Sequence, residues 1–448
     1  MPGPLPVVGD AWPLLRDPIG FLSSLPSRGD LAPLRLGPMP VSVVCTPGLA
    51  QQVLRDDRTF DKGGPFFDRI RDLLGEAVAT CPHSQHRRLR RLVQPAFRDE
   101  QLRRYQPVMR AEAERLAASW SDGQSIDVMA ATMAYTTRLA LRTLFSVSLT
   151  KERLDAAVSD IETWVAGVPR QMLLPPGAGH LPLPANRRYR EAITGLRATI
   201  ADAVEERRGR AVDTQEPDLL ASLIIAQDSE DPSGRLNDTE LINNAATFLA
   251  AGTETSATAL AWMFHLLALH PHVQRDLRTE IAGQEEHTDA ADRPGHDDGS
   301  LCHRVALEAL RLHAPAWLLT RTVTAHTALD GIPRATGATV AYSPYALHRN
   351  AAYFPDPQAF RPDRWIDWTP EPGTFLTFGG GPRSCVGHRF AMLELTAALR
   401  AVAAAWELEP LDAGPPRPRL GATLAPGGLR LRVRARANSG AQQGPLNS

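Results

Sequence analysis

Phe378-Gly379-Gly380-Gly381-Pro382-Arg383-Ser384-Cys385-Val386-Gly387 is the stretch from which the fold and the chemistry of this chain are most directly inferred. It places a cysteine after a glycine-rich loop and an arginine, and just before a run with the apolar spacing of a helix. Positive charge and a helix N-terminus both stabilise a thiolate. Cys385 is therefore well suited to bind a metal through its sulfur.

Two other interpretations of Cys385 are a buried free cysteine and one half of a zinc site. Zinc sites need several thiols or histidines at short spacing, whereas Cys45, Cys81 and Cys302 are scattered singly along the chain. Haem iron can instead be held by one cysteine thiolate, which donates electron density that favours O–O cleavage. The spacing of the cysteines therefore favours a haem-thiolate site.

The run fits the pattern Phe-x-x-Gly-x-Arg-x-Cys-x-Gly, and a chance match in a chain of this size is expected about once in ten thousand. With this run the chain resembles the cytochrome P-450 superfamily, in its bacterial, ferredoxin-dependent form. The resemblance implies haem b as cofactor, Cys385 as the axial ligand of its iron, and Phe378 and Gly379 as haem contacts. It also implies a mainly α fold with a small β part, in which haem lies between a long central helix and the helix after the cysteine loop.

Composition supports one large globular unit. Hydrophobic residues make up 43% and charged residues 22% of the chain, enough to fill a core without favouring disorder. We expect one haem-thiolate monooxygenase domain over residues 1–437 and a disordered tail over 438–448. A net charge of −1 excludes general attraction for nucleic acid. Without a secretory leader, a membrane anchor or a disulfide framework, we expect a cytoplasmic protein that is a monomer.

Hydrophobic periodicity predicts helices over residues 84–120, 129–145, 186–210, 238–270, 301–313 and 388–406. Short strands are expected at 34–36, 41–44 and 339–342, and residues 63–74 are expected to form a loop or short helices. The helix over 238–270 would be about 50 Å long, which is enough to cross the whole domain.

The middle of that long helix contains Ala251-Gly252-Thr253-Glu254-Thr255-Ser256. Glycine and hydroxyl residues are poor helix formers, and the run alone fits a local Thr-x-x-Glu hydrogen-bonding pattern or a small-residue packing face equally well. The resemblance instead makes it the oxygen-activating kink of the superfamily. It implies that Gly252 lets dioxygen approach the backbone, that Thr255 holds a water, and that Glu254 supplies protons.

Two further sets of polar residues follow from the resemblance. Glu308 and Arg311 lie three residues apart, so they share a helix face and can pair; the resemblance adds Arg364 as a third, structural partner. Haem propionates are carboxylates, which arginine binds well. The resemblance assigns them to His86, Arg90, Arg321, His348 and Arg383.

The predicted helix at 84–120 also carries Arg87, Arg88 and Arg91. A basic helix usually means a solvated face or an anionic partner. We expect these arginines to face outward near the proximal haem surface, where an acidic electron donor could dock. The chain has no flavin or iron–sulfur motif, so the expected electron donors are a separate ferredoxin and ferredoxin reductase.

The residues expected around the substrate are apolar, although such residues are more often core than pocket. They are Phe66, Phe67, Ile70, Leu74, Phe248, Ala250, Ala251, Trp317, Leu318 and Leu424. The runs at 57–65 and 183–188 are similar to bacterial terpene hydroxylases of the pentalenene oxygenase type.

The resulting hypothesis is a monooxygenase that inserts one oxygen atom from dioxygen into an apolar natural product. The expected substrate is a terpene, which would be hydroxylated once or oxidised in successive steps. Alternatives are oxidation of a macrocyclic polyketide, a peroxide-driven or isomerising haem-thiolate enzyme, and a haem-binding sensor without catalysis.

Overall fold

The computed structural model of this chain describes residues 9–37, 39–145, 150–174, 177–209, 218–231, 234–285, 299–411, 414 and 416–435. The tail expected at 438–448 and the last two residues of the expected domain lie outside these ranges. In the described part, no helix is both long and apolar enough to cross a membrane.

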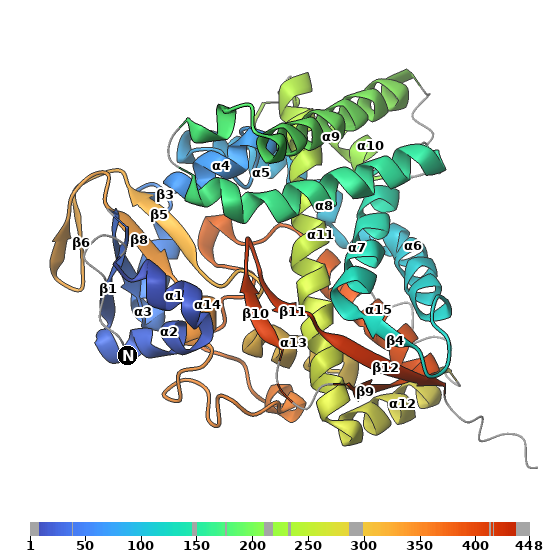
Figure 1. Ribbon diagram of the computed structural model, residues 1–448. Helices are drawn as coiled ribbons and strands as arrows, with labels where there is room; N and C mark the ends of the chain where they lie inside the picture. Colours follow the sequence, from blue (N-terminus) through green and yellow to red (C-terminus); the bar gives the residue numbers. More distant parts are fainter. Residues whose placement is uncertain are drawn as a thin grey trace, which may run out of the picture.

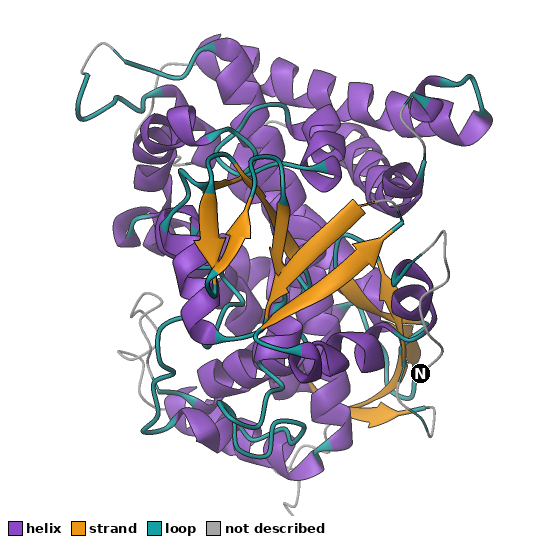
Figure 2. Cartoon of the chain, turned by 90° about the vertical axis from the view of Figure 1, so that its left-hand side faces the viewer, coloured by secondary structure: helices purple, strands orange, loops and turns teal. Residues whose placement is uncertain are grey.

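Helices form most of the molecule, and most strands gather at one side of it (Figures 1 and 2). The helices are α1 (Ala11–Arg16), α2 (Pro18–Ser24), α3 (Pro47–Arg55), α4 (Pro65–Leu74), α5 (His83–Val93), α6 (Asp99–Ala118), α7 (Val128–Phe145), α8 (Lys151–Leu173), α9 (Pro184–Gly209), α10 (Leu219–Ile224), α11 (Asp238–Leu269), α12 (Pro271–Glu285), α13 (Leu301–Leu312), α14 (Pro344–Leu347) and α15 (His388–Ala405). Short 3-10 turns occur at η1 (Leu25–Arg28), η2 (Gln94–Phe97), η3 (Ala178–His180), η4 (Pro362–Trp365) and η5 (Gly381–Arg383). The mainly α fold with a small β part is therefore confirmed.

The largest sheet has the strand order β1-β2-β8-β5-β3, with β2 and β8 parallel and the other neighbours antiparallel. Its strands are β1 (Leu31–Leu36), β2 (Met39–Val44), β3 (Phe60–Asp61), β5 (Leu319–Val323) and β8 (Thr339–Tyr342). The smaller sheets are β4-β12-β9, β10-β11 and β6-β7. Their strands are β4 (Ser125–Asp127), β6 (Thr327–Leu329), β7 (Ile332–Arg334), β9 (Trp406–Pro410), β10 (Arg417–Leu420), β11 (Leu424–Gly427) and β12 (Arg430–Ala435).

Helix α11 runs through the middle of the molecule (Figure 1). It begins with a capping box, in which the Asn237 side chain accepts from the Glu240 N–H and the Glu240 carboxylate accepts from the Asn237 N–H. It ends before Pro271, which begins α12. Its 32 residues correspond to a length of about 48 Å. The expected central helix is therefore present.

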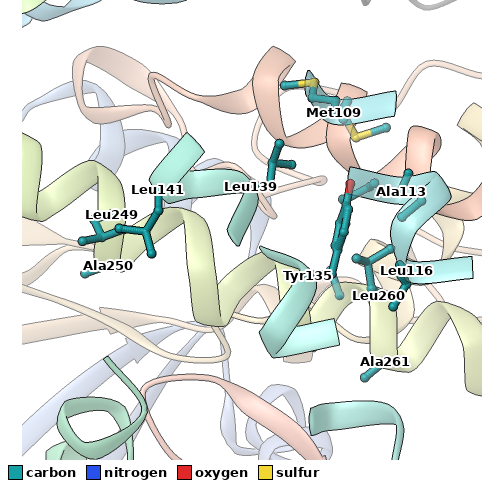
Figure 3. Close-up of a cluster of buried hydrophobic side chains, with 14 of the residues drawn as sticks. Met109, Ala113, Leu116, Tyr135, Leu139, Leu141, Leu249, Ala250, Leu260 and Ala261 are labelled. Carbon is teal, nitrogen blue, oxygen red and sulfur yellow. The ribbon is translucent and has the colours of Figure 1, made fainter. Parts of the chain in front are cut away.

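The main core forms where α6 and α7 pack against α11 and α15 (Figure 3). Met109 and Leu116 of α6 meet Tyr135 and Leu139 of α7, and Leu260 of α11 belongs to the same buried cluster. The Tyr135 hydroxyl donates to the backbone carbonyl of Glu394 in α15, at 3.0 Å. These contacts join the central helix to the helix that follows the cysteine loop.

The structure differs from the sequence prediction in several helical regions; α3 and α12, for example, were not predicted. The helix expected over 84–120 is divided into α5 and α6 by η2, where Pro95 lacks the N–H needed for a continuous helix. Residues 65–74 form one helix, α4, instead of a loop or short helices. Helix α8 was not predicted at all, although Thr150 provides an N-cap for it by accepting from the Arg153 N–H.

A buried carboxylate, that of Glu308, joins α13 to the irregular segment before the cysteine loop. Arg311 donates two hydrogen bonds of 2.8 Å to it, and Arg364 lies 3.4 Å from its Oε1. The backbone N–H of Arg361 and the indole N–H of Trp365 also donate to it, each at 3.0 Å. Glu308 and Arg311 are fully buried, so the expected trio forms an interior ion-pair network.

We expect Glu308→Gln to lower the free energy of unfolding by about 3–5 kcal/mol, because it leaves the buried guanidinium of Arg311 without a counter-charge. Equilibrium unfolding in urea measures this. Glu205→Gln is the matched control, since Glu205 forms an exposed pair with Arg208 and should change stability little. Equal unfolding midpoints for the two variants would contradict the structural role of Glu308.

Candidate functional site

The cysteine loop is a tight turn that ends at the N-terminus of a helix. The Cys385 N–H donates to the Phe378 carbonyl at 2.8 Å, which closes the loop. Gly381 has φ +63°, and a Cβ there would lie 2.1 Å from the Leu54 carbonyl oxygen, so both the backbone conformation and the space require glycine. Helix α15 begins three residues after Cys385. The loop therefore presents the sulfur where the helix dipole favours negative charge.

The Cys385 side chain is exposed, so its sulfur is accessible to a ligand. Protein atoms nevertheless surround it closely enough that desolvation raises the pKa of the thiol, an effect opposed by the Gly387 N–H and the positive charges of Arg90 and Lys62. A metal cation would favour the thiolate further. Cys385 is thus an accessible single thiol with positive charge nearby, as a haem-thiolate ligand requires.

Positive side chains gather in the same region. Arg90 of α5 donates to the Ser384 carbonyl, next to Cys385, at 2.6 Å. Burial and the charges of Arg321 and Arg383 lower the pKa of Lys62 well below its ordinary value. Burial, followed by Arg383, lowers the pKa of His86 to about 4, so this imidazole is neutral at pH 7. The group combines arginine cations, a lysine whose charged form is disfavoured by burial and by neighbouring arginines, and a neutral hydrogen-bonding ring.

Arg321 of β5 is 2% exposed. Its guanidinium donates to the Thr320 carbonyl at 2.8 Å, and no carboxylate pairs with it among the residues that the structure describes. A buried cation of this kind needs a counter-charge. Together with Lys62 it suits a ligand that carries carboxylates, and the two propionates of haem meet that requirement.

Arg383 has an additional role that its position in the motif does not indicate. Its guanidinium donates to Asp57 at 2.9 Å, to Asp61 at 2.8 Å and to the Cys81 carbonyl at 2.9 Å. Asp57 also lies 3.2 Å from His83 and 3.9 Å from His86. Arg383 therefore links the cysteine loop to residues 57–61, and only its remaining N–H groups are left for another partner.

The prediction that His348 binds a propionate is wrong. The ring is fully buried, its Nδ1 lies 3.2 Å from the Arg311 carbonyl, and its Nε2 accepts from the Leu376 N–H at 2.8 Å. This pattern requires the neutral tautomer with hydrogen on Nδ1. Burial also lowers its pKa to about 3. His348 instead braces the chain that leads into the cysteine loop.

Helix α11 stays α-helical through 251–256, so the expected kink does not interrupt it. The Thr255 hydroxyl donates to the Ala251 carbonyl and the Thr253 hydroxyl to the Ala250 carbonyl, so both back-bond to their own helix. A Cβ at Gly252 would meet no atom closer than Ala140, at 4.0 Å. Ala251 is exposed although most of the helix is buried, so this face of α11 has room for a ligand.

Glu254 points to the turn between β10 and β11. Its Oε1 accepts from the Thr423 hydroxyl at 2.8 Å and from the Thr423 N–H at 3.3 Å. Burial raises the pKa of Glu254, while the two Thr423 contacts and the charge of Arg419 act in the opposite direction. A carboxyl that keeps its proton closer to neutral pH is suited to general acid chemistry.

The basic residues of α5 that were expected to face outward form ion pairs with acidic residues of the same chain. Arg91 binds Asp228 through two hydrogen bonds of 2.6 and 2.8 Å and lies 3.0 Å from Glu230. Arg87 donates to Glu230, and Arg88 to Glu240, each at 2.6 Å. Arg87 faces outward as expected, with 80% of its side chain exposed, whereas only 23% of the Arg91 side chain is exposed, and acids about 140 residues later in the chain pair with all three arginines.

Most of the residues predicted around the substrate pack in one of two buried clusters. Phe67, Ile70, Leu74, Phe248 and Ala250 lie on α4 and α11, whereas Trp317, Leu318 and Leu424 pack with the core beside the largest sheet. Ala250 lies beside Leu141 of α7 in Figure 3, so it packs between helices. Phe248 packs edge to face on Phe97, 5.0 Å between ring centroids. The side chain of Phe66 lies outside the described residues.

Sequence reasoning missed Lys62, Trp365 and Thr423. A sequence feature could have drawn attention to Lys62, because it is one of two lysines in a chain that otherwise uses arginine. No sequence feature marks Trp365 or Thr423, since each donates a hydrogen bond to a residue more than 50 positions earlier in the chain.

Comparison with known proteins gives the same picture over the whole chain. Pentalenene oxygenase from Streptomyces avermitilis is 41% identical over 97% of both chains, and cyclooctatin synthase from Streptomyces melanosporofaciens is 39% identical over 96% of this chain and 94% of that one. Among solved structures, the cytochrome P-450DA heme domain matches with a TM-score of 0.84 and 25% identity, covering 98% of each chain. A cytochrome P-450 from Thermus thermophilus matches with a TM-score of 0.73, 26% identity, and coverage of 95% of this chain and 98% of that one.

The family model described as Cytochrome P-450 matches residues 1–432, which is nearly the whole sequence. Haem b is the cofactor of that family, and its members incorporate oxygen from dioxygen with electrons from redox partners. The accessible thiol of Cys385 and the buried cation Arg321 suit this cofactor. The chain belongs to the cytochrome P-450 family and is a monooxygenase.

Proposed function

We propose that this enzyme hydroxylates a terpene, with electrons supplied by a ferredoxin and its reductase. The similarity to pentalenene oxygenase, 41% identity over 97% of both chains, carries this proposal. Cyclooctatin synthase and cyclooctat-9-en-7-ol 5-monooxygenase, at 39% and 37% identity, also have names that refer to cyclic terpenes. Apolar residues on α4, on α11 and after α13 support a hydrocarbon substrate, which would bind by burial with few polar contacts.

In this proposal, haem supplies the iron that activates dioxygen, and Cys385 holds that iron. Arg321, His86 and Arg90 bind the propionates, with Lys62 and Arg383 adding positive charge around them. The reaction consumes one dioxygen, two electrons and two protons, and releases a hydroxylated product and one water. The protons pass through Glu254, whose buried carboxyl is the acid nearest in sequence to Gly252 and Thr255.

Cys385→Ser is expected to abolish the absorption band that reduced thiolate-ligated haem gives with carbon monoxide, because serine does not supply the sulfur ligand. The measurement is a reduced, carbon monoxide difference spectrum of the purified variant. Cys45→Ala is the control, since Cys45 is buried beside β1 and β2 and should leave the band unchanged. A normal band in Cys385→Ser would refute the assignment of the ligand.

Arg321→Leu is expected to increase the rate of haem loss by about tenfold, because a charge-assisted hydrogen bond to a propionate is removed. Transfer of haem from the enzyme to apomyoglobin measures this rate without requiring turnover. Arg434→Leu serves as the control, since Arg434 pairs with Glu409 at the surface. Identical rates for the two variants would show that Arg321 does not hold the cofactor.

Cyclic terpene hydrocarbons are expected to shift the spin state of the ferric haem by displacing the water on the iron. Optical titration with a panel of terpenes and macrocyclic polyketides would reveal this, followed by product analysis with ferredoxin, reductase and NADPH. A hydroxylated terpene is the expected product. A spin-state shift with macrocyclic polyketides but not with terpenes would show that the substrate is a polyketide. Turnover with peroxide but not with redox partners would indicate the peroxide-driven alternative, and binding without any product would indicate a sensor.

A further inference from the structure

We propose that Thr423, in the turn between β10 and β11, is a positioning residue that fixes the proton of Glu254 on its Oε2 atom. This inference rests on the proposed role of Glu254 as the proton donor. It concerns which oxygen of the carboxyl carries the proton, which determines the direction in which the proton can leave.

All hydrogen bonds that Glu254 receives from described residues converge on one oxygen. The Thr423 hydroxyl and the Thr423 N–H both donate to Oε1, at 2.8 and 3.3 Å. The Thr258 hydroxyl lies 2.9 Å from the Thr423 hydroxyl. The Thr423 N–H can only donate, which marks Oε1 as an acceptor; with the Thr423 hydroxyl hydrogen also directed at Oε1, the Thr258 hydroxyl is the donor of the contact between the two threonines. The order of donation is therefore Thr258 to Thr423 to Glu254.

The other oxygen of Glu254 has a different environment. Among the residues described by the structure, no group forms a hydrogen bond with Oε2. An oxygen that accepts two hydrogen bonds acts as the carbonyl of a neutral carboxyl, so the O–H group belongs on the other oxygen. Burial raises the pKa of Glu254 and so favours this neutral form. The proton on Oε2 is consequently not committed to any protein acceptor.

The turn that carries Thr423 is itself held in place by the same helix. Glu254, Thr258 and Trp262 are spaced four residues apart on one face of α11. Glu254 and Thr258 contact Thr423, and the Trp262 indole donates to the Leu424 carbonyl at 2.8 Å. From the segment after α13, the Trp317 indole donates to the Gly421 carbonyl at 3.2 Å. These contacts hold Thr423 in position to donate to Oε1 before any reaction begins.

Infrared spectroscopy of the ferric holoenzyme tests the inference directly. A neutral Glu254 gives a carboxyl C=O stretching band that Glu254→Gln removes, which identifies it. We expect Thr423→Val to shift this band to higher wavenumber, because the carbonyl oxygen loses its hydroxyl donor. Thr423→Ser should restore the wild-type band. Thr143→Val is the matched control, since the Thr143 hydroxyl is buried but bonds only within α7.

Two results would overturn the inference: absence of a Glu254 band in the wild type, or an unchanged band in Thr423→Val. If Thr423→Val does not fold, Thr258→Val provides the same test, because it removes the donor to Thr423 and should give a smaller shift in the same direction.

The peroxide released per NADPH consumed then separates this inference from the proposed function. Glu254→Gln should raise peroxide release strongly, and Thr423→Val should raise it by up to about tenfold, the effect of one lost hydrogen bond. Normal coupling in Glu254→Gln would refute the role of Glu254 itself. Uncoupling in Glu254→Gln together with wild-type coupling in Thr423→Val would refute only the role of Thr423.

Discussion

The arrangement around Cys385 depends on one buried charge, the carboxylate of Glu308. A carboxylate with no exposed surface is tolerated only when its hydrogen-bonding capacity is met, and here two guanidinium N–H groups of Arg311 and an indole N–H contribute to meeting it. Arg311 in turn donates to the His348 carbonyl. The His348 ring then accepts a hydrogen bond from the Leu376 N–H, nine residues before Cys385. These hydrogen bonds connect the buried side chains of α13 to the segment that leads into the loop of Cys385.

The second constraint is electrostatic. Burial desolvates both Lys62, whose charge acts on the Cys385 thiol, and Arg321, whose charge acts on Lys62, and Arg321 has no acidic partner among the residues described. Nearby Arg383, by contrast, is paired with Asp57 and Asp61. This contrast explains which cations are available to a cofactor. Arg383, paired with Asp57 and Asp61, has a structural role, whereas Arg321 and Lys62 have no carboxylate partner in the described part of the chain and suit the negative propionates of haem.

Parts of the fold that depend on local pattern were predictable, and contacts between distant segments were not. The apolar spacing along α7, α9, α11, α13 and α15 placed these helices within one or two residues of their observed ends, because each buries a continuous face. The arginines of α5 are visible in the sequence, but their acidic partners Asp228, Glu230 and Glu240 are separated from them by about 140 residues. His348 illustrates the same point, since its partner Leu376 is distant in the chain. In both cases the side chain could be identified and its contact could not.

The amino-acid sequence by itself determined the family, the cofactor and the central helix, and it predicts Cys385 as the ligand of the iron, because each rests on residues close together in the chain. Only the tertiary structure decided how the surrounding groups divide their roles: which arginines are neutralised, which histidine braces the loop, and which oxygen of Glu254 is held by Thr423. Those outcomes depend on hydrogen bonds between segments that packing brings together, and no spacing along the chain encodes them.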